Sequence, residues 1–235
     1  MTPRQSPGPE AAEVEKQTRA LFRSIALERQ GYYDSSPGGP RRLSVWQRRI
    51  RRIVLSLLDD TLRREPASAR LLDAGCGRGD FTLQLAARYA GLLEVIGYDF
   101  SAELIELARA AAAGQPRIRF AVGGLDALPF PRSHVDVTVC VNVLHHIPHE
   151  RLAVALAELA RVTRRTLVVE IKNAVSPYFR LHSHRVEGVA IFPVTVEQMR
   201  DGFRRHGFEL VSRRGIFGLL WLSPLVVLRF ERAGS

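Results

Sequence analysis

Two hydrophobic periods alternate along the chain from Arg70 onward. Short apolar runs of strand length alternate with stretches whose apolar residues recur every three or four positions. The short runs predict buried strands, and the helical spacing predicts amphipathic helices. The expected strands cover residues 70–72, 93–98, 117–122, 135–141, 166–170, 208–217 and 225–231, and the expected helices start at Phe81 and cover 101–113, 149–162 and 195–207. This alternation predicts βαβ units around a mostly parallel sheet.

The region before Arg70 has a different, purely helical pattern. Residues 10–30 and 43–64 predict two helices, separated by a Gly- and Pro-rich loop over 31–40. The second helix shows an apolar stripe suited to burial, formed by Val45, Trp46, Ile50, Ile53, Leu57 and Leu58. We therefore expect an N-terminal helical cap over 1–64 and a larger domain over 65–235, with the irregular stretch 172–194 inserted as a lid.

A glycine-rich turn follows the first expected strand. It reads Asp73-x-Gly75-x-Gly77-x-Gly79 and leads directly into a helix. A strand, a glycine turn and a helix form the first unit of a nucleotide-binding sheet, where glycines let a ligand lie against the backbone. The dinucleotide fingerprint G-x-G-x-x-G fails, because its third glycine would fall on Asp80. A carboxylate at Asp73 suits a ligand with an ammonium or sulfonium charge better than a pyrophosphate.

Two polar residues end other expected strands. Asp99 lies 20 residues beyond Gly79 at the end of the second strand, where an acid can accept hydrogen bonds from ribose hydroxyls. Asn142 lies at the end of the fourth strand, and ligands of open α/β sheets bind at that edge. Both residues are therefore expected beside the glycine turn.

The motifs together resemble the class I S-adenosylmethionine-dependent methyltransferases. The glycine turn resembles their first motif, and the segment 123–130, ending Leu-Pro-Phe, resembles the adenine-flanking segment of the quinone-biosynthesis type. The run Leu144-His145-His146 after the fourth strand is also similar to the family. One departure is Gly124, which stands where the family usually has an acid. Asp126 corresponds to a second, more variable acidic position.

The resemblance covers roughly residues 43–232 and implies a fold and a cofactor. The implied fold is a Rossmann-like, doubly wound, seven-stranded, mostly parallel sheet whose last strand runs antiparallel, with N-terminal helices added. The implied cofactor is S-adenosylmethionine, and no metal is expected. The residues expected to bind the cofactor are Asp73, Gly75, Cys76, Gly77, Gly79, Asp99, Phe100, Leu125, Asp126 and Asn142.

The implied reaction is methyl transfer to a small molecule, by O- or C-methylation. A general base is needed only if the acceptor must lose a proton. His145 is the first candidate, and Tyr32, Tyr33, Glu170 and His182 are alternatives. Two adjacent histidines cannot both point the same way, so at most one of His145 and His146 is expected to act.

Three segments are expected to reach the acceptor: the loop over 31–40, the insertion 172–194 and the apolar loop over 218–222. They mix aromatic, basic and apolar side chains, which favours a partly apolar and partly anionic acceptor such as a lipid, a quinone precursor or a similar secondary metabolite. The expected acceptor contacts are Tyr32, Tyr33, His146, Tyr178, Arg180, His182 and Trp221.

The net charge of +10 is concentrated in the two ends of the chain. Residues 1–64 carry 13 basic and 7 acidic side chains and residues 173–235 carry 9 and 5, whereas 65–172 carry 12 of each. Solvated helix faces explain such an excess, and 32 of the 34 basic residues are Arg, which also fits GC-rich codon usage. The alternative interpretation is an anionic substrate or a peripheral contact with a membrane surface.

Other function classes are less favoured by the sequence. A nicotinamide oxidoreductase conflicts with Asp80 in the glycine turn, and no DNA partner is expected. An RNA methyltransferase is disfavoured, because Asn142 is not followed by the Pro-Pro-aromatic run used on base amines. A non-catalytic protein that only binds S-adenosylmethionine stays an alternative because of Gly124. The sequence does not indicate an oligomeric state.

Two cysteines and a polar, proline-rich start predict a cytoplasmic protein. Cys76 and Cys140 show neither disulfide nor metal-site spacing, and residues 1–9 do not resemble a signal peptide. The apolar run 216–228 has 13 residues and contains Ser223-Pro224. A membrane span needs about 20 residues. We therefore expect a hairpin of strands there.

Overall fold

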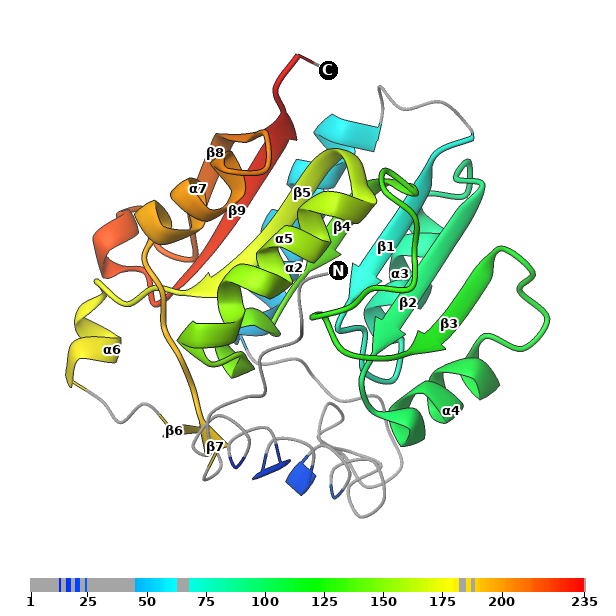
Figure 1. The fold of residues 1–235 in the computed structure, drawn as a ribbon, viewed down its shortest axis with the longest axis horizontal. Coiled ribbons are helices and arrows are strands. Elements are labelled where there is room, and N and C mark those ends of the chain that lie inside the picture. The colour runs from blue at the N-terminus through cyan, green and yellow to red at the C-terminus, as the bar shows by residue number, and fades with distance from the viewer. Residues whose placement is uncertain are drawn as a thin grey trace, which may run out of the picture.

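The computed structural model describes residues 45–62, 68–181, 185–186 and 189–234, together with positions 13, 16, 17, 20, 21 and 24. A seven-stranded sheet with helices on both faces dominates this part of the chain (Figure 1). Its strands are β1 (Arg70–Ala74), β2 (Glu94–Asp99), β3 (Ile118–Val122), β4 (Val135–Cys140), β5 (Thr163–Lys172), β8 (Phe208–Gly215) and β9 (Leu225–Arg232).

The helices that cover this sheet differ in length. They are α2 (Val45–Leu62), α3 (Asp80–Arg88), α4 (Ala102–Ala111), α5 (His149–Val162), α6 (Pro177–Leu181) and α7 (Val196–Arg204). Two short 3-10 helices, η1 (Leu144–His146) and η2 (Leu220–Leu222), lie in the connections after β4 and β8. β6 (Arg185–Val186) and β7 (Val189–Ala190) form a separate two-stranded sheet.

The strand order confirms the predicted doubly wound fold. The order is β3-β2-β1-β4-β5-β9-β8, and β1 to β5 all run parallel. β9 pairs antiparallel with both β5 and β8, as expected of the last strand. The order reverses between β1 and β4, and ligands of such sheets bind outside the carboxyl ends of the strands at this switch point.

The sheet is covered on both faces because its central strands are apolar on both sides. Every residue of β4 is buried. Val137 and Val139 share a core with α2 and α3, whereas Val135 and Cys140 share a core with α5 and α7. Figure 1 shows α5 and α7 in front of the sheet and α2 behind it. Parallel strands with two covered faces are expected to form such continuous apolar runs.

Helix α2 packs on the sheet through the stripe that the sequence predicts. Ile50, Leu57 and Leu58 are buried in one core with Val137 and Val168. The stripe prediction is wrong at its first residue, Val45, whose side chain is 59% exposed. The boundary proposed at residue 64 stays a prediction, and this helix shares its core with the sheet.

The segment between β5 and α7 has more structure than predicted. The expected strand over 166–170 extends to Thr163–Lys172, and the stretch expected to be irregular contains α6 and the β6–β7 pair. The apolar run 216–228 follows β8 through η2 into β9, which agrees with the expected hairpin. Within the described residues, no helix has the length and apolarity needed to cross a membrane.

Helix α7 begins with the predicted capping box. The Gln198 backbone N–H donates to the Thr195 hydroxyl, and the Gln198 side chain accepts from the Thr195 backbone N–H. Replacing Thr195 with alanine is expected to lower the free energy of unfolding by about 1 kcal/mol, because one cap is lost. Urea denaturation followed by circular dichroism measures this change. A loss below about 0.3 kcal/mol would show that the cap adds little here.

Candidate active site

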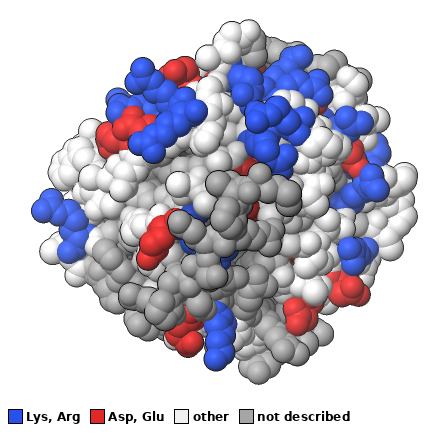
Figure 2. All heavy atoms as spheres, in the orientation of Figure 1, with Lys and Arg blue, Asp and Glu red and all other residues white. Residues whose placement is uncertain are grey.

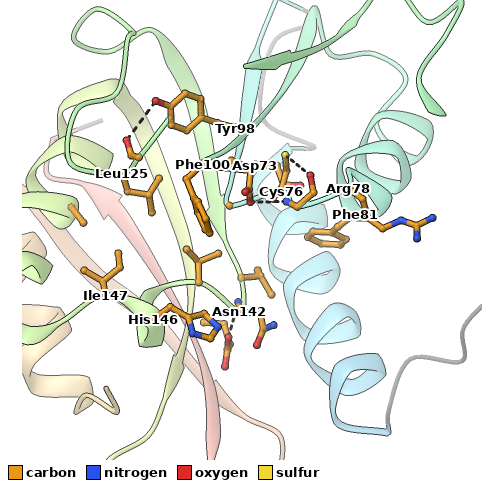
Figure 3. Close-up of a pocket in the computed structure, with 18 of the residues that line it drawn as sticks. Asp73, Cys76, Arg78, Phe81, Tyr98, Phe100, Leu125, Asn142, His146 and Ile147 are labelled. Atoms are coloured by element: carbon orange, nitrogen blue, oxygen red, sulfur yellow. Dashed lines mark hydrogen bonds between the residues drawn. The ribbon is translucent and has the colours of Figure 1, made fainter. Parts of the chain in front are cut away.

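One pocket lies at the carboxyl ends of β1, β2, β4 and β5, next to the switch point. Its wall combines the glycine turn after β1, the end of β2, the segment 123–126, the segment 141–143 and side chains of α2. In Figure 3, Leu125 and Ile147 lie on one side of Phe100, and Asp73, Cys76 and Phe81 lie on the other. The pocket therefore has one largely apolar wall and one wall that carries acid and backbone groups.

The glycine turn is fixed by backbone bonds to the neighbouring strand. The N–H groups of Gly75 and Cys76 both donate to the carbonyl of Tyr98 at the end of β2. Gly75 and Gly77 adopt positive φ, and a Cβ at Gly75 would collide with the Val143 side chain. Position 75 thus needs glycine for two reasons: its backbone has a positive φ, and the loop after β4, which contains Val143, lies against it.

Gly79 allows close packing of neighbouring elements and is not part of the pocket wall. Its φ is 81°, and a Cβ there would lie 2.8 Å from the Phe120 ring and 3.0 Å from Ala108. Gly79 does not line the pocket, although it precedes α3 directly. Its expected part in cofactor binding is thus an indirect one: it lets α3 begin close to β3 and α4.

Asp99 lines the pocket and is almost completely buried. Its Oδ2 accepts a 2.9 Å hydrogen bond from the Gly77 N–H, and its Oδ1 accepts one of 2.9 Å from Ser101. Burial raises the pKa of this carboxyl, and the backbone N–H donors oppose that rise. The backbone N–H groups of Gly77, Ser101 and Phe100 all donate to this carboxylate, which has about four acceptor sites and can still accept a bond from a ligand hydroxyl.

Asp73 is a second buried acid in the same wall. The Thr82 hydroxyl on α3 donates to its Oδ2 over 2.7 Å. Burial raises the pKa of Asp73 to about 6, and the hydrogen bond from Thr82 and the charge of Arg51 oppose the rise. A cationic group of a ligand would favour the ionised form of this carboxyl.

The opposite wall combines apolar groups with one ion pair. Phe100 and Leu125, which the sequence predicts as cofactor contacts, line the pocket, and so do Ile147 and Pro148. Asp126 also lines it, but its Oδ2 accepts a 2.8 Å bond from Arg151 of α5. An amino group of a ligand would therefore share Asp126 with this arginine.

The two histidines after β4 lie in different environments. His145 is 4% exposed and does not line the pocket, whereas His146 does. Within the described part of the chain, Nδ1 of His145 has no hydrogen-bond partner. Burial, with the nearby charge of Lys172, lowers the pKa of His146 to about 4 and that of His145 well below its usual value. His146 thus presents a neutral imidazole to the pocket at pH 7.

Asn142, Glu170 and Lys172 form a connected cluster at the ends of β4 and β5. Glu170 is 1% exposed, and its Oε2 accepts a 2.8 Å bond from the Asn142 N–H. Lys172 Nζ donates over 3.1 Å both to Glu170 Oε1 and to Asn142 Oδ1. Asn142 has a φ of 62°, a conformation that L residues rarely adopt. The cluster holds Asn142 in this conformation at the edge of the pocket.

Helix α2 contributes residues that sequence reasoning missed. Gln47, Ile50 and Arg51 line the pocket, and the Arg51 guanidinium lies 5.1 Å from the centre of the Phe81 ring. Helical spacing shows which face of α2 is buried, but not which strand ends that face meets. Lys172 and Arg78 were missed as well, because lone basic residues in this arginine-rich chain carry no distinguishing pattern.

Several predicted acceptor contacts lie away from the pocket. Tyr178, Arg180 and Trp221 are exposed and do not line it. Tyr32, Tyr33 and His182 lie outside the described residues. Among the described residues, no group of three or more His, Cys, Asp or Glu side chains is arranged to hold a metal ion.

The comparisons with known proteins agree on one family. Residues 71–166 match the family model described as a methyltransferase domain. The chain is 31% identical over 191 residues to O-methyltransferase cnsE of Penicillium expansum, a match that covers 74% of this chain and 67% of that protein. It is also 29% identical to the ubiquinone/menaquinone biosynthesis C-methyltransferase UbiE of Geobacter sulfurreducens, over 47% of this chain and 45% of that protein.

Solved structures share the fold over almost the whole chain. Magnesium protoporphyrin IX methyltransferase from Synechocystis PCC 6803 with bound SAH superposes with a TM-score of 0.70. The match covers 93% of this chain and 100% of that chain at 20% sequence identity, which supports the fold alone. The chain spans about half the length of the first curated relatives it matches, such as the Geobacter protein.

Proposed function

Since the chain belongs to the class I S-adenosylmethionine-dependent methyltransferases, we propose that it binds S-adenosylmethionine in the pocket and methylates a small molecule there. The observation that carries the proposal is the arrangement of Asp99 and Gly77. A buried carboxylate that can still accept a bond lies against a glycine backbone that offers no side chain. This arrangement suits the paired hydroxyls of a ribose.

The other pocket groups fit the remaining parts of this cofactor. The apolar wall with Leu125 and Phe100 suits a flat adenine ring, and Asp73 suits the cationic amino-acid end. Arg51 lies near Asp73 and can pair with the carboxylate of that end. The cofactor supplies a methyl group that its sulfonium charge has already activated. The protein's own task is to align the acceptor and to exclude water.

The acceptor end of the pocket favours a hydroxyl or enol group on a partly apolar molecule. Burial lowers the pKa of His146 to about 4, so its imidazole is neutral at pH 7 and can accept a hydrogen bond from a hydroxyl group of the acceptor. Lys172 carries a positive charge in the same wall and can stabilise negative charge that develops on an oxygen. A phenol- or enol-type acceptor can then react at oxygen or at a neighbouring carbon. A lipid or quinone precursor of this kind fits the partly apolar and partly anionic acceptor that the sequence predicts.

Calorimetry with three ligands tests the cofactor proposal. S-adenosylmethionine and S-adenosylhomocysteine are expected to bind, and NAD is not. Formation of S-adenosylhomocysteine is then followed with phenolic, enolic and carboxylic acceptors, with RNA as a comparison. Binding without transfer to any acceptor class would favour the non-catalytic alternative. Absence of binding to both sulfur compounds would contradict the proposal.

The affinity for S-adenosylmethionine is expected to fall in acid. The pKa of Asp73 is about 6 in the folded protein, so the carboxylate is ionised at pH 8 and becomes protonated as the pH falls below 6. Loss of this charge weakens the attraction for the cofactor's ammonium group. We expect the dissociation constant to rise by up to about tenfold per pH unit below 6. Calorimetry between pH 5 and 8 measures this dependence.

The variant Asp73→Asn provides the control for this pH dependence. It keeps an acceptor for Thr82 but lacks the titrating group, so its affinity is expected to be lower at pH 8 and nearly flat towards pH 5. Asp99 also has a raised pKa, and any slope that persists in Asp73→Asn would be assigned to it. An unchanged slope in this variant would contradict the role given to Asp73.

A further inference from the structure

A cluster of aromatic and aliphatic side chains, most of them exposed, lies outside the pocket. Three segments meet there: the start of α2, the region of α6, and the connection between β8 and β9. The Trp46 ring of α2 packs edge-on against the rings of Tyr178 in α6 and Phe217 after β8. The distances between ring centres are 5.4 Å and 6.3 Å. We call this region the aromatic surface, and its residues are Val45, Trp46, Val175, Tyr178, Leu181, Phe217, Leu219, Trp221 and Leu222.

Several apolar side chains of the aromatic surface have large exposed fractions. Leu181 is 81% exposed, and Leu219 and Trp221 are each 56% exposed. In Figure 1, α6 lies at the left edge of the molecule, close to the turn that joins β8 to β9, and α6 contacts η2. Contiguous exposed apolar side chains of this kind mark an interaction site on a soluble domain.

The described segments that form the aromatic surface carry basic residues and no acidic ones. The segments 45–53, 173–181 and 211–225 contain seven arginines and no Asp or Glu. Arg180, Arg213 and Arg49 have exposed side chains, and Arg214 donates to Ser56 of α2 and so ties β8 to that helix. On the face drawn in Figure 2, basic side chains gather in several clusters, and acidic side chains lie beside some of them. Among the described residues, the aromatic surface therefore combines apolar side chains with exposed arginines such as Arg49, Arg180 and Arg213.

We infer that the aromatic surface docks on an anionic lipid membrane. Trp and Tyr favour the membrane interface, and exposed Leu side chains can enter the outer part of the acyl region. Arginines beside them can reach the anionic headgroups. Two other occupants fit less well. A second copy would place the exposed arginines of both chains, such as Arg49, Arg180 and Arg213, opposite one another. Aliphatic side chains such as Leu181 do not stack on nucleic-acid bases.

The position of the aromatic surface connects it with the pocket. Trp46 belongs to the surface, and the next residue, Gln47, lines the pocket together with Arg51 one turn further along α2. An apolar acceptor dissolved in the membrane could thus reach the pocket alongside α2. This last step rests on the proposed function, whereas membrane docking itself does not.

Sedimentation with lipid vesicles tests the inference on the full chain. We expect the protein to bind vesicles of phosphatidylcholine with 30% phosphatidylglycerol, and to bind pure phosphatidylcholine vesicles at least tenfold more weakly. Raising the salt to 0.5 M should weaken binding to the anionic vesicles, because the electrostatic part is screened. The double variant Leu219→Ser/Trp221→Ser should bind at least tenfold more weakly than the wild type.

A matched variant and a spectroscopic readout complete the experiment. Leu93→Ser/Val154→Ser removes two similarly exposed apolar side chains elsewhere and should bind like the wild type. In a Trp46→Phe background, Trp221 is the single tryptophan, and its emission should shift to the blue on anionic vesicles. Titration with S-adenosylmethionine, which the Leu219→Ser/Trp221→Ser variant should still bind, keeps the two proposals separate.

Three results would overturn the inference. One is no binding to the anionic vesicles, and another is equal binding by the Leu219→Ser/Trp221→Ser variant. The third is a dimer by light scattering that this variant abolishes, which would assign the aromatic surface to a second copy of the chain.

Discussion

Replacing Asp99 with alanine is expected to lower the affinity for S-adenosylmethionine and S-adenosylhomocysteine by at least about 100-fold. The ribose is expected to donate to this carboxylate, and a hydrogen bond to a charged group contributes about 1.5–3 kcal/mol. The substitution also leaves the Gly77 N–H without its acceptor at 2.9 Å, so the glycine turn loses a contact that fixes it. Calorimetry at pH 8 measures the change in affinity.

Two further variants separate this effect from general damage to the fold. Asp201→Ala removes an exposed carboxylate on α7 that does not line the pocket, and should leave the affinity unchanged. Asp99→Asn keeps the size of the side chain but loses its charge, so its affinity should lie between those of the wild type and Asp99→Ala. Far-UV circular dichroism checks that each variant is folded. An affinity within threefold of the wild type for Asp99→Ala would refute the assignment of the ribose site.

Replacing Lys172 with methionine should destabilise the protein by about 3–5 kcal/mol, because it leaves a buried charge without its partner. Glu170 is 1% exposed, and its Oε1 accepts from Lys172 Nζ over 3.1 Å. The same change removes the donor to the Asn142 side chain, so the segment after β4 loses part of its support. Urea denaturation gives the free energy of unfolding.

The double variant Lys172→Met/Glu170→Gln tests the cause of this loss. It removes both charges, so most of the stability lost in Lys172→Met should return. Arg200→Met breaks an exposed ion pair with Asp201 and should change stability by less than about 0.5 kcal/mol. If the double variant were no more stable than Lys172→Met, the uncompensated charge of Glu170 would not be the reason.

The central part of the pocket could be predicted because it depends on local chemistry. Gly75 and Gly77 need positive φ, and Asp99 ends an apolar strand, so both features are visible in a short stretch of sequence. The fold could be predicted because short apolar runs, such as the one that forms β4, alternate along the chain with apolar residues at helical spacing. The antiparallel last strand came from the family resemblance and not from the pattern.

The rest depended on packing between distant segments. His145 and His146 are adjacent, and the short helix η1 decides which of them lines the pocket; no pattern in the sequence predicts that turn. Arg51 reaches the pocket because α2 packs across β5 and β9, a contact that its own apolar stripe does not specify. Tyr178 was expected beside the acceptor, but α6 directs it towards Trp46 instead.

The place of β9 in the sheet has a consequence for how the protein is made. β9 is the last strand in chain order, yet it lies between β5 and β8 and pairs with both. While a ribosome is still synthesising residues 225–232, β5 has one unpaired edge and β8 has no neighbour in the sheet. An exposed strand edge can pair with another chain. The nascent protein should therefore need protection by chaperones until synthesis passes β9, and a chain truncated before Leu225 should aggregate rather than fold.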